Sequence, residues 1–397
     1  MHPAIQCEHL YGASNYEPLP VVLVRGEGVY VWDDGGNRYI DMMSAYSAVS
    51  HGHCHPELVS VLAAEAAKLA VVSRAFYTDM LGRFLQKACE ATGMARALPM
   101  NTGAEAVETA IKAARKWAYT VKGVAADKAE IIACEGNFHG RTTTIVGMSS
   151  EPQYREGFGP FAPGFKLVPF GDARALEKAI TPNTAAFLVE PIQGEGGIIV
   201  PPEGYLRKAM KICREHNVLL IADEIQTGLG RTGRFLACEH EGVHPDAVLL
   251  GKALGGGLLP VSLFLAREEV MAVFTPGDHG STFGGNPLAA AVGTAAIEIL
   301  LRDGLAENAS EMGRYLRESL ARIRSPLITE IRGRGLMLGL EIDPRYSARK
   351  LCLRLLNEGI LTRETHNTVI RLAPPLVITR EQIDEAVAAI AGVMVEA

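Results

Sequence analysis

The sequence predicts an α/β protein, with a large domain built on a mostly parallel seven-stranded sheet flanked by helices, and a small α+β domain. Two observations predict this fold class. Short, nearly continuous apolar runs alternate with helical patterns over residues 47–296, which is typical of parallel strands covered on both faces. The pattern changes after about residue 296, and 397 residues are enough for a second domain.

Residues 1–46 form the first predicted unit, an N-terminal segment. They are rich in proline and glycine and contain short strand-like pieces, such as VYVW at residues 29–32. We expect this segment to pack with the small C-terminal domain.

The large domain is predicted over residues 47–296 from seven candidate strands. These are residues 97–100, 130–133, 166–169, 185–190, 218–223, 247–251 and 261–266. In an open α/β sheet, ligands bind beyond the carboxyl ends of the strands. Asn101, Glu190, Asp223 and Lys252 all fall at such ends, so we expect the functional site there.

The small domain is predicted over residues 297–397. Helical stretches near residues 288–301 and 310–323 come before a strand pair around residues 328–341. A last helix is expected to begin near Thr379, because Thr379 and Gln382 have the spacing of a capping box.

The composition excludes several classes of function. The net charge is -6 without a basic block, which argues against nucleic acid as a partner. The longest apolar stretch, residues 258–266, is too short to cross a membrane. The first residues lack a basic region followed by an apolar core, so no secretory signal is expected. The seven cysteines are scattered, which favours free thiols and a cytoplasmic location.

Asp223 and Lys252 are the most informative pair in the chain. Each ends an apolar run, and glycines follow Lys252 at residues 255–257. A lysine amine can form an imine with an aldehyde cofactor, and a carboxylate can keep a ring nitrogen of that cofactor protonated. A surface lysine and a capping aspartate are the alternatives, but glycines next to Lys252 would leave room for a bulky ring.

A candidate phosphate site follows the strand at residues 97–100. Thr102, Gly103 and Ala104 open a helical pattern, and free N–H groups at a helix start bind anions. Many strand–helix junctions share this pattern, so the signal is weak without the lysine and the aspartate.

The segment GNFHGRT at residues 136–142 offers an aromatic ring and a cation among small residues. Phe138 could stack on a cofactor ring, and Arg141 could hold a substrate carboxylate. A core phenylalanine and a surface arginine are the alternative interpretation.

Two further motifs point to other functions. GLGRTG at residues 228–233 matches a dinucleotide-binding pattern, but neither the helix nor the acidic residue that such a fold needs comes next. HGHCH at residues 51–55 invites a metal interpretation, but no second cluster of ligands appears, so we predict a turn and no metal.

The chain resembles the class III aminotransferases, pyridoxal phosphate enzymes of fold type I, over essentially its whole length. The signature LIADEIQTG at residues 220–228, followed by Lys252, is highly specific. Supporting segments are NYEPLP at 15–20, SAYSAV at 44–49, VEPIQGE at 189–195, HGSTFGGNP at 279–287 and IRLAPPL at 370–376. Within the family, the members that act on ornithine are the most similar.

The resemblance implies pyridoxal 5'-phosphate as the cofactor. Lys252 would form the imine with it and later move the proton, and Asp223 would hold the ring nitrogen. The implied cofactor-binding residues are Thr102, Gly103, Ala104, Phe138, Glu190, Asp223, Ile225, Gln226, Lys252, Ser281 and Thr282. Ser281 and Thr282 would reach over from a second subunit, so a homodimer is the expected unit.

The resemblance also implies how small-molecule substrates are bound. The reaction would convert ornithine and 2-oxoglutarate into glutamate 5-semialdehyde and glutamate. Glu195 would mask Arg371 while ornithine is bound and release it for the α-carboxylate of glutamate. Arg141 would take the other carboxylate. Tyr16 and Tyr46 would recognise the α-amino end of ornithine.

Three functions are weighed against one another. The first is ornithine δ-aminotransfer, the second is aminotransfer from N-acetylornithine or 4-aminobutyrate on the same scaffold, and the third is a dinucleotide-binding or other binding protein without pyridoxal phosphate. His139 departs from the tryptophan expected in animal ornithine enzymes, which leaves the packing beside Phe138 open.

Overall fold

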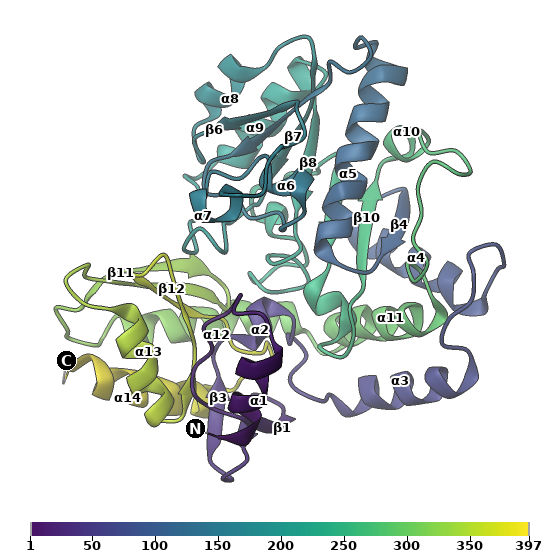
Figure 1. The fold of residues 1–397 in the computed structure, drawn as a ribbon. Coiled ribbons are helices and arrows are strands. Elements are labelled where there is room, and N and C mark those ends of the chain that lie inside the picture. The colour runs from purple at the N-terminus through teal and green to yellow at the C-terminus, as the bar shows by residue number, and fades with distance from the viewer. Residues whose placement is uncertain (1, 396–397) are drawn as a thin grey trace.

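A seven-stranded sheet forms the centre of the larger part of the molecule in this computed structural model, which describes residues 2–395 (Figure 1). Its strand order is β4-β10-β9-β8-β7-β5-β6. The strands are β4 (Arg96–Met100), β5 (Glu130–Cys134), β6 (Phe165–Val168), β7 (Thr184–Val189), β8 (Leu219–Asp223), β9 (Ala247–Leu250) and β10 (Ser262–Ala266). Each predicted strand overlaps an observed one, so the predicted sheet is confirmed.

The strand directions bring the expected ends together. β5 to β9 pair in parallel, whereas β10 pairs antiparallel with both β9 and β4. Because β4 is antiparallel to an antiparallel strand, it runs in the same direction as the parallel set. The carboxyl ends of β4, β7, β8 and β9 therefore lie at one edge of the sheet.

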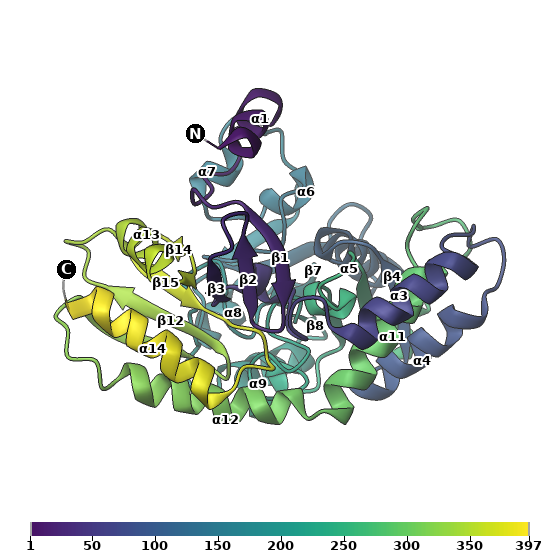
Figure 2. The ribbon, with the colours of Figure 1, turned by 90° about the horizontal axis from the view of Figure 1, so that it is seen from below.

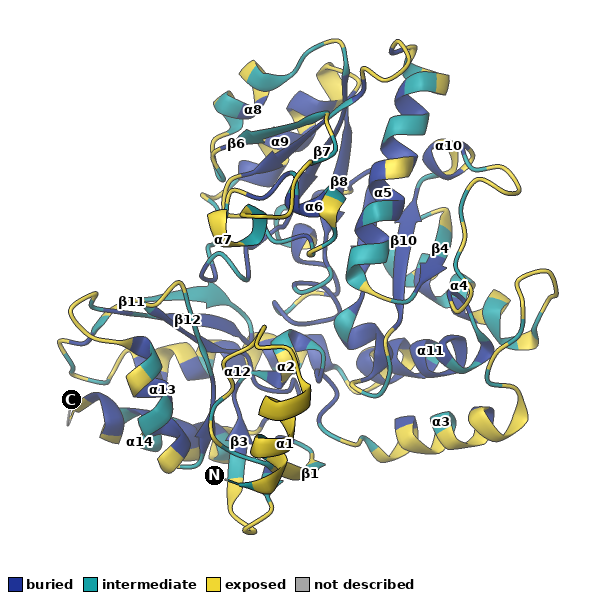
Figure 3. Ribbon diagram, in the orientation of Figure 1, coloured by how far each residue is buried: buried dark blue, intermediate teal, exposed yellow. Residues whose placement is uncertain are grey.

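Helices cover both faces of this sheet. Leu219 and Ile221 of β8 belong to the apolar cluster under α5 (Gly103–Trp117), whereas Leu220 belongs to the larger cluster on the opposite face, with α8 (Ala173–Ala179) and α9 (Tyr205–Glu215). The alternation follows from the two-residue period of a strand. Figure 3 shows the inner strands β8 and β10 as buried, whereas the edge strand β6 is mostly of intermediate exposure.

The other helices of this part are short or peripheral. They are α2 (Ser44–Ser47), α3 (Pro56–Lys68), α4 (Asp79–Thr92), α6 (Thr143–Val146), α7 (Pro152–Arg155) and α10 (Glu268–Met271), with the π-helix η1 (Ala118–Lys122) and the 3-10 helices η2 (Ala237–Glu241) and η3 (Lys252–Gly255). Within residues 2–395, every helix is too short or too polar to span a bilayer.

A second sheet with three helices forms the smaller part. Its order is β11-β12-β15-β14. The strands are β11 (Ile328–Arg334), β12 (Met337–Ile342), β14 (Glu364–Thr365) and β15 (Val369–Leu372), and the helices are α12 (Leu305–Leu320), α13 (Ala348–Asn357) and α14 (Arg380–Val395). In Figure 2, α12 and α14 lie side by side under this sheet.

The ends of these helices test the sequence prediction. The N–H of Thr379 donates to Oε1 of Gln382 (2.9 Å), and the N–H of Gln382 donates to Oγ1 of Thr379 (3.4 Å), so the predicted capping box is confirmed. The helix expected at 310–323 begins earlier, at Leu305, because the left-handed Gly304 turns the chain there and Leu305 and Ala306 are buried.

The N-terminal segment contributes a third, four-stranded sheet of order β1-β2-β3-β13. It contains β1 (Leu23–Glu27), β2 (Tyr30–Asp33), β3 (Arg38–Asp41) and the distant β13 (Ile360–Leu361), and α1 (Pro3–Tyr11) comes before it. α11 (Pro287–Arg302) runs unbroken past residue 296. The division at residues 46 and 296 stays a prediction.

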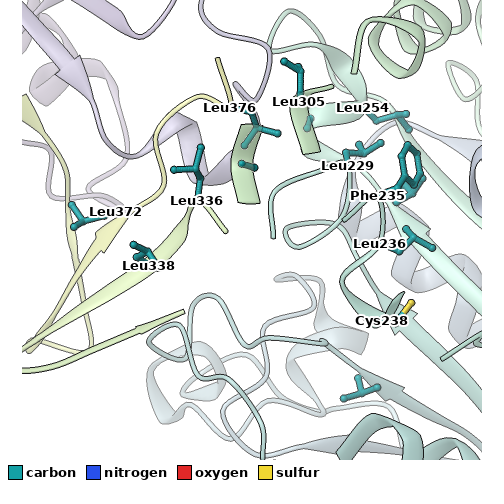
Figure 4. Packing of buried hydrophobic residues seen from close by; sticks show 14 of the residues in the cluster. Leu229, Phe235, Leu236, Cys238, Leu254, Leu305, Leu336, Leu338, Leu372 and Leu376 are labelled. Carbon is teal, nitrogen blue, oxygen red and sulfur yellow. The ribbon is translucent and has the colours of Figure 1, made fainter. Parts of the chain in front are cut away.

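The loop that carries the GLGRTG motif lies between the two larger parts (Figure 4). Its Leu229 belongs to the same apolar cluster as Leu336 and Leu376. Arg231 is fully buried there, and its guanidinium donates to the carbonyls of Leu336 (2.9 Å) and Pro374 (2.5 Å) and to Ser50 Oγ (3.0 Å). Through Arg231, the GLGRTG loop is therefore linked to Ser50 and to the chain around Leu336 and Pro374.

Two histidines of the HGHCH motif form hydrogen bonds, and the third comes directly before a helix. The ring of His51 bonds to the carbonyl of Ala296 (2.8 Å), and the ring of His53 bonds to Asp41 (2.8 Å). His55 comes directly before α3. Among residues 2–395, no three His, Cys, Asp or Glu side chains are arranged to hold a metal ion.

Candidate active site

A cavity of about 190 Å³ opens at the carboxyl edge of the central sheet. Loops after β5, β7, β8 and β9 and the start of α5 enclose it. The lining residues are Gly103, Ala104, Phe138, His139, Gly140, Glu190, Ile192, Asp223, Ile225, Gln226, Thr227 and Lys252. Eight of the predicted site residues are therefore brought together, namely Gly103, Ala104, Phe138, Glu190, Asp223, Ile225, Gln226 and Lys252.

Lys252 begins η3 with a left-handed backbone, at φ 46°. That conformation is uncommon for a residue other than glycine and often occurs at functional sites. Burial lowers the pKa of the Lys252 amine, although the carboxylates of Glu195, Asp223 and Glu190 act against this shift. A lower pKa makes the neutral amine more available as a nucleophile.

Asp223 is almost fully buried, and two groups hold its carboxylate. Oδ2 lies 2.7 Å from Nδ1 of His139, and Oδ1 accepts the N–H of Ile225 at 3.1 Å. Burial acts to lower the pKa of His139, but the hydrogen bond to Asp223 and the negative charges of Asp223 and Glu190 together outweigh burial, and the pKa is raised. Nε2 of His139 is buried and has no hydrogen-bond partner among the described residues.

This contact between His139 and Asp223 is absent from the sequence prediction, which left the role of His139 open. A histidine next to a phenylalanine carries no signal that it reaches a strand end 84 residues away. The sequence offers one hint to this contact. Adjacent side chains in an extended loop point to opposite sides, so Phe138 and His139 face different neighbours.

Glu190 is a second buried carboxylate beside the cavity. It accepts the N–H of Phe138 at 2.9 Å and the N–H of Gly194 at 3.4 Å. Burial raises its pKa to about 7. The Glu190 side chain therefore links the loop that bears Phe138 to the loop that bears Gly194.

The start of α5 has the form of an anion site. Thr102 and Glu105 form a capping box, which leaves the N–H groups of Gly103 and Ala104 without partners inside the helix. Ser262 Oγ donates to the carbonyl of Thr102 at 2.7 Å and fixes this turn. A Cβ on Gly103 would lie 3.1 Å from the Ile225 side chain, so a larger residue at this position would require the Ile225 side chain to move.

The loop after β7 leaves space for Gln226. A Cβ on Gly194 would lie 1.9 Å from Oε1 of Gln226, so any other residue there would displace the glutamine from the cavity. The sequence alone does not explain why residue 194 is a glycine, because Gln226, whose side chain needs this space, is 32 positions away.

Glu195 and Arg371 form an ion pair of 2.6 Å at the side of the smaller domain, as the resemblance implies. The guanidinium of Arg371 lies 4.7 Å from the ring centre of Tyr46. Tyr46 projects from α2, where residues 44–47 all have positive φ. Thr365 Oγ1 donates to the carbonyl of Glu195 at 2.8 Å and fixes that residue.

Arg141 follows the loop that bears Phe138 and is exposed. Its guanidinium is 4.2 Å from the ring centre of Tyr154 and 5.7 Å from that of Phe138. The two rings meet edge to face at 5.9 Å. Tyr154 is a residue that sequence reasoning missed, because nothing in the segment EPQYRE distinguishes a site tyrosine from a surface one.

Tyr16, Ser281 and Thr282 lie outside this cavity in the single chain. Tyr16 is 64% exposed and Thr282 is also exposed. Ser281 Oγ accepts a hydrogen bond from the side-chain amide of Asn101 at 2.9 Å, one residue before the capping box of α5.

Comparisons with known proteins agree with this site. The family described as Aminotransferase class-III matches residues 11–394. An ornithine aminotransferase from Geobacillus sp. (strain WCH70) is 57% identical over 383 residues, which cover 96% of each chain. The solved ornithine aminotransferase from Toxoplasma gondii ME49 has a TM-score of 0.98 and 46% identity, over 99% of this chain and 94% of that one.

A related enzyme with a different substrate in its name is similar as well. The solved acetylornithine aminotransferase from Elizabethkingia anophelis has a TM-score of 0.91 and 48% identity, over 99% of this chain and 98% of that one. All three relatives are aminotransferases, and the family match spans nearly the whole sequence. The chain therefore belongs to the class-III aminotransferase family.

Proposed function

We propose that the protein transfers the δ-amino group of L-ornithine to 2-oxoglutarate, which gives glutamate 5-semialdehyde and L-glutamate. The observation that carries this proposal is the Glu195–Arg371 ion pair beside the Tyr46 ring. While Glu195 neutralises Arg371, the Tyr46 ring offers a polar aromatic surface to the free α-amino end of ornithine. The ornithine aminotransferases that resemble the chain over nearly its full length support the same substrate.

Pyridoxal phosphate is the cofactor of this family, and when bound it supplies an aldehyde that takes the amino group and a ring that accepts electrons. The residues around the cavity fit it. The unpartnered N–H groups at Gly103 and Ala104 suit a phosphate. The partly buried amine of Lys252 suits an aldehyde, and the buried carboxylate of Asp223 suits a protonated ring nitrogen.

Each of the main residues at the cavity has its own role in the proposed reaction. Lys252 is the group that takes a proton from the reacting carbon and returns it, because its lowered pKa favours the neutral amine. Asp223 is held in place by its contacts with His139 and the Ile225 N–H, and its carboxylate would hold the ring nitrogen. Phe138 provides an apolar wall, and Gln226 provides an amide at the cavity.

Substrate exchange is proposed to depend on the Glu195–Arg371 pair. While ornithine is bound, Glu195 neutralises Arg371. When a dicarboxylate binds, Arg371 leaves Glu195 for the α-carboxylate of the substrate, and Arg141 takes the distal one. Arginine suits this exchange because it binds carboxylates through two parallel hydrogen bonds. Tyr16 is proposed to complete the pocket for the α-amino end.

We further propose that the working unit is a homodimer, in which Ser281 and Thr282 of a second copy complete the phosphate site. Support comes from a patch of exposed apolar side chains, with Phe76 67% exposed, Tyr77 106% exposed and Phe283 56% exposed. The loop that bears Phe76 and Tyr77 adjoins the helix start that follows Phe283, because the N–H of Leu288 in α11 donates to the carbonyl of Ala70 at 3.4 Å. A cytoplasmic location is proposed from the seven free cysteines.

A panel of amine donors with 2-oxoglutarate tests the proposed substrate. We expect kcat/KM to be highest for ornithine, and lower for N-acetylornithine and 4-aminobutyrate. A preference for N-acetylornithine would instead favour the second candidate, which the similar enzyme from Elizabethkingia anophelis supports.

Substitution of Tyr46 by Ile sharpens this test. Removal of the ring beside Arg371 takes away a polar aromatic partner for the free α-amine, so the relative kcat/KM for 4-aminobutyrate should rise. An unchanged ratio of kcat/KM for ornithine to kcat/KM for 4-aminobutyrate would show that Tyr46 does not recognise the α-amino end.

A further inference from the structure

The aromatic surface under Arg141 is built from two separate segments. Phe138 belongs to the loop after β5, and Tyr154 belongs to α7. Of the two rings, Tyr154 is the closer to the guanidinium, at 4.2 Å against 5.7 Å. Burial raises the pKa of the Tyr154 phenol, so the ring is neutral at neutral pH and attracts the cation through its face.

Arg141 has no ion pair among residues 2–395, in contrast to Arg371, which Glu195 neutralises. Among the described residues, its guanidinium contacts the Phe138 and Tyr154 rings. An exposed arginine without a carboxylate partner samples many rotamers, and holding it against a ring face removes that freedom before a ligand arrives. Its charge then remains available for a carboxylate from outside the chain.

The segment that carries Tyr154 is held in place by other residues. The Arg155 guanidinium donates to the carbonyls of Gly147 (3.0 Å) and Ser149 (2.9 Å), and it stacks on Phe161 at 4.7 Å. The Tyr154 side chain therefore takes no part in these anchoring contacts, and α7 can keep its place when this ring is changed.

We propose that Tyr154 is a positioning residue for Arg141, which it holds ready for the substrate carboxylate remote from the reacting amine. This inference rests on the proposed function, because it concerns the carboxylate of ornithine and the distal carboxylate of 2-oxoglutarate. Tyr154 acts through Arg141, whereas Arg371 and Glu195 act on the other end of the substrate. The Tyr154 ring thereby sets how strongly the enzyme prefers dicarboxylate acceptors.

Binding of glutarate, an unreactive dicarboxylate, to the holoenzyme tests the proposal without turnover. Calorimetric titration of Tyr154→Leu should give a Kd about 2- to 5-fold above that of the wild type, which is the range expected when a cation–ring contact at an exposed arginine is lost. Tyr154→Phe keeps the ring face and should match the wild type. Tyr346→Leu, on an exposed loop outside the site, is the matched control.

Steady-state kinetics then separate positioning from a general structural role. In Tyr154→Leu, KM for 2-oxoglutarate should rise with the Kd of glutarate, while kcat and the absorbance spectrum of the bound cofactor stay unchanged. Pyruvate, which lacks a distal carboxylate, should show no rise in KM. Equal losses for pyruvate and 2-oxoglutarate, or a Tyr154→Phe variant as weak as Tyr154→Leu, would overturn the proposal.

Failure of the proposed function leaves a different signature. If ornithine proved a poor donor, the donor panel would change while the effect of Tyr154 on glutarate binding persisted. If glutarate bound Tyr154→Leu as tightly as the wild type, the positioning role would be wrong even with ornithine as the preferred donor.

Discussion

The amine of Lys252 combines a lowered pKa with a left-handed backbone at the end of β9. Lys252→Ala removes the amine that we propose binds the aldehyde and moves the proton. We expect kcat to fall by at least about 10³-fold, within the range known for general acid–base groups. The absorbance band of the bound cofactor near the visible edge should also disappear.

Lys211→Ala is the control for that experiment, because Lys211 is exposed and pairs only with Glu215. It should leave the spectrum and the rate unchanged. A Lys252→Ala enzyme that kept its rate would mean that another amine serves the reaction, and a wild type without any band would favour a binding protein that lacks pyridoxal phosphate.

The contact between His139 and Asp223 makes a pH-dependent contribution to stability. Burial acts to lower the pKa of His139, but the hydrogen bond to Asp223 and the charges of Asp223 and Glu190 together raise it in the folded state. A raised pKa means that this contribution is fully present below the unfolded pKa, near 6.5. It is then lost as the pH rises through the folded pKa.

His139→Asn, which keeps a neutral donor near Asp223, isolates this effect. The difference in free energy of unfolding between the wild type and His139→Asn should be largest below about pH 6.5 and should shrink as the pH rises. Urea melts at several pH values measure it. A difference that grows with pH would contradict the charged pair.

At the scale of elements, the capping box of α5 joins helix stability to anion binding. Thr102→Ala removes the hydroxyl that accepts the Glu105 N–H. Loss of such a cap typically costs about 1 kcal/mol, and the N–H groups at Gly103 and Ala104 lose their fixed direction. We therefore expect lower thermal stability and weaker cofactor binding.

Thr102→Ser is the matched variant, because it keeps the hydroxyl. Equilibrium dialysis of the cofactor and thermal melts should both show recovery. If Thr102→Ala weakened the helix without any change in cofactor affinity, the start of α5 would not be the phosphate site.

The elements themselves were largely predictable from the sequence. The seven strands carry continuous apolar runs because both faces of the sheet are covered, and this local pattern locates β7, β8 and β9 without knowledge of their neighbours. The direction of β10 was not predictable, since an apolar run of five residues looks the same in either direction. Strand direction depends on the path of the chain between strands.

The candidate site was predictable only where residues lie at strand ends or in a recognisable family segment. Asp223 and Lys252 meet at one edge because their strands are parallel neighbours. The contacts of His139 and Tyr154 depend on how two loops fold over that edge, and neither loop has a periodic pattern. The space that Gly194 leaves for Gln226 likewise arises only in three dimensions.

At the scale of the whole molecule, the exposed apolar patch around Phe283 predicts an oligomer. Phe283→Asp places a charge in that patch, and burial of an unpaired charge is costly. We expect light scattering after size-exclusion chromatography to show a dimer for the wild type and a monomer for Phe283→Asp. Activity should fall with the loss of the dimer, because Thr282 lies next to the substituted residue.

Phe158→Asp provides the comparison, since Phe158 is similarly exposed, at 60%, but lies in another loop. It should remain a dimer. A Phe283→Asp protein that stayed dimeric and fully active would place the subunit contact elsewhere.

Arg231 has a consequence for the length of the substrate. Its buried guanidinium bonds to Ser50 and to the carbonyl of Pro374, which lie four residues after Tyr46 and three residues after Arg371. These bonds hold the segments that bear Tyr46 and Arg371 together around one buried guanidinium. If Tyr46 and Arg371 bind one end of the donor, as proposed, this fixed arrangement selects donors by the number of carbons between their two amino groups.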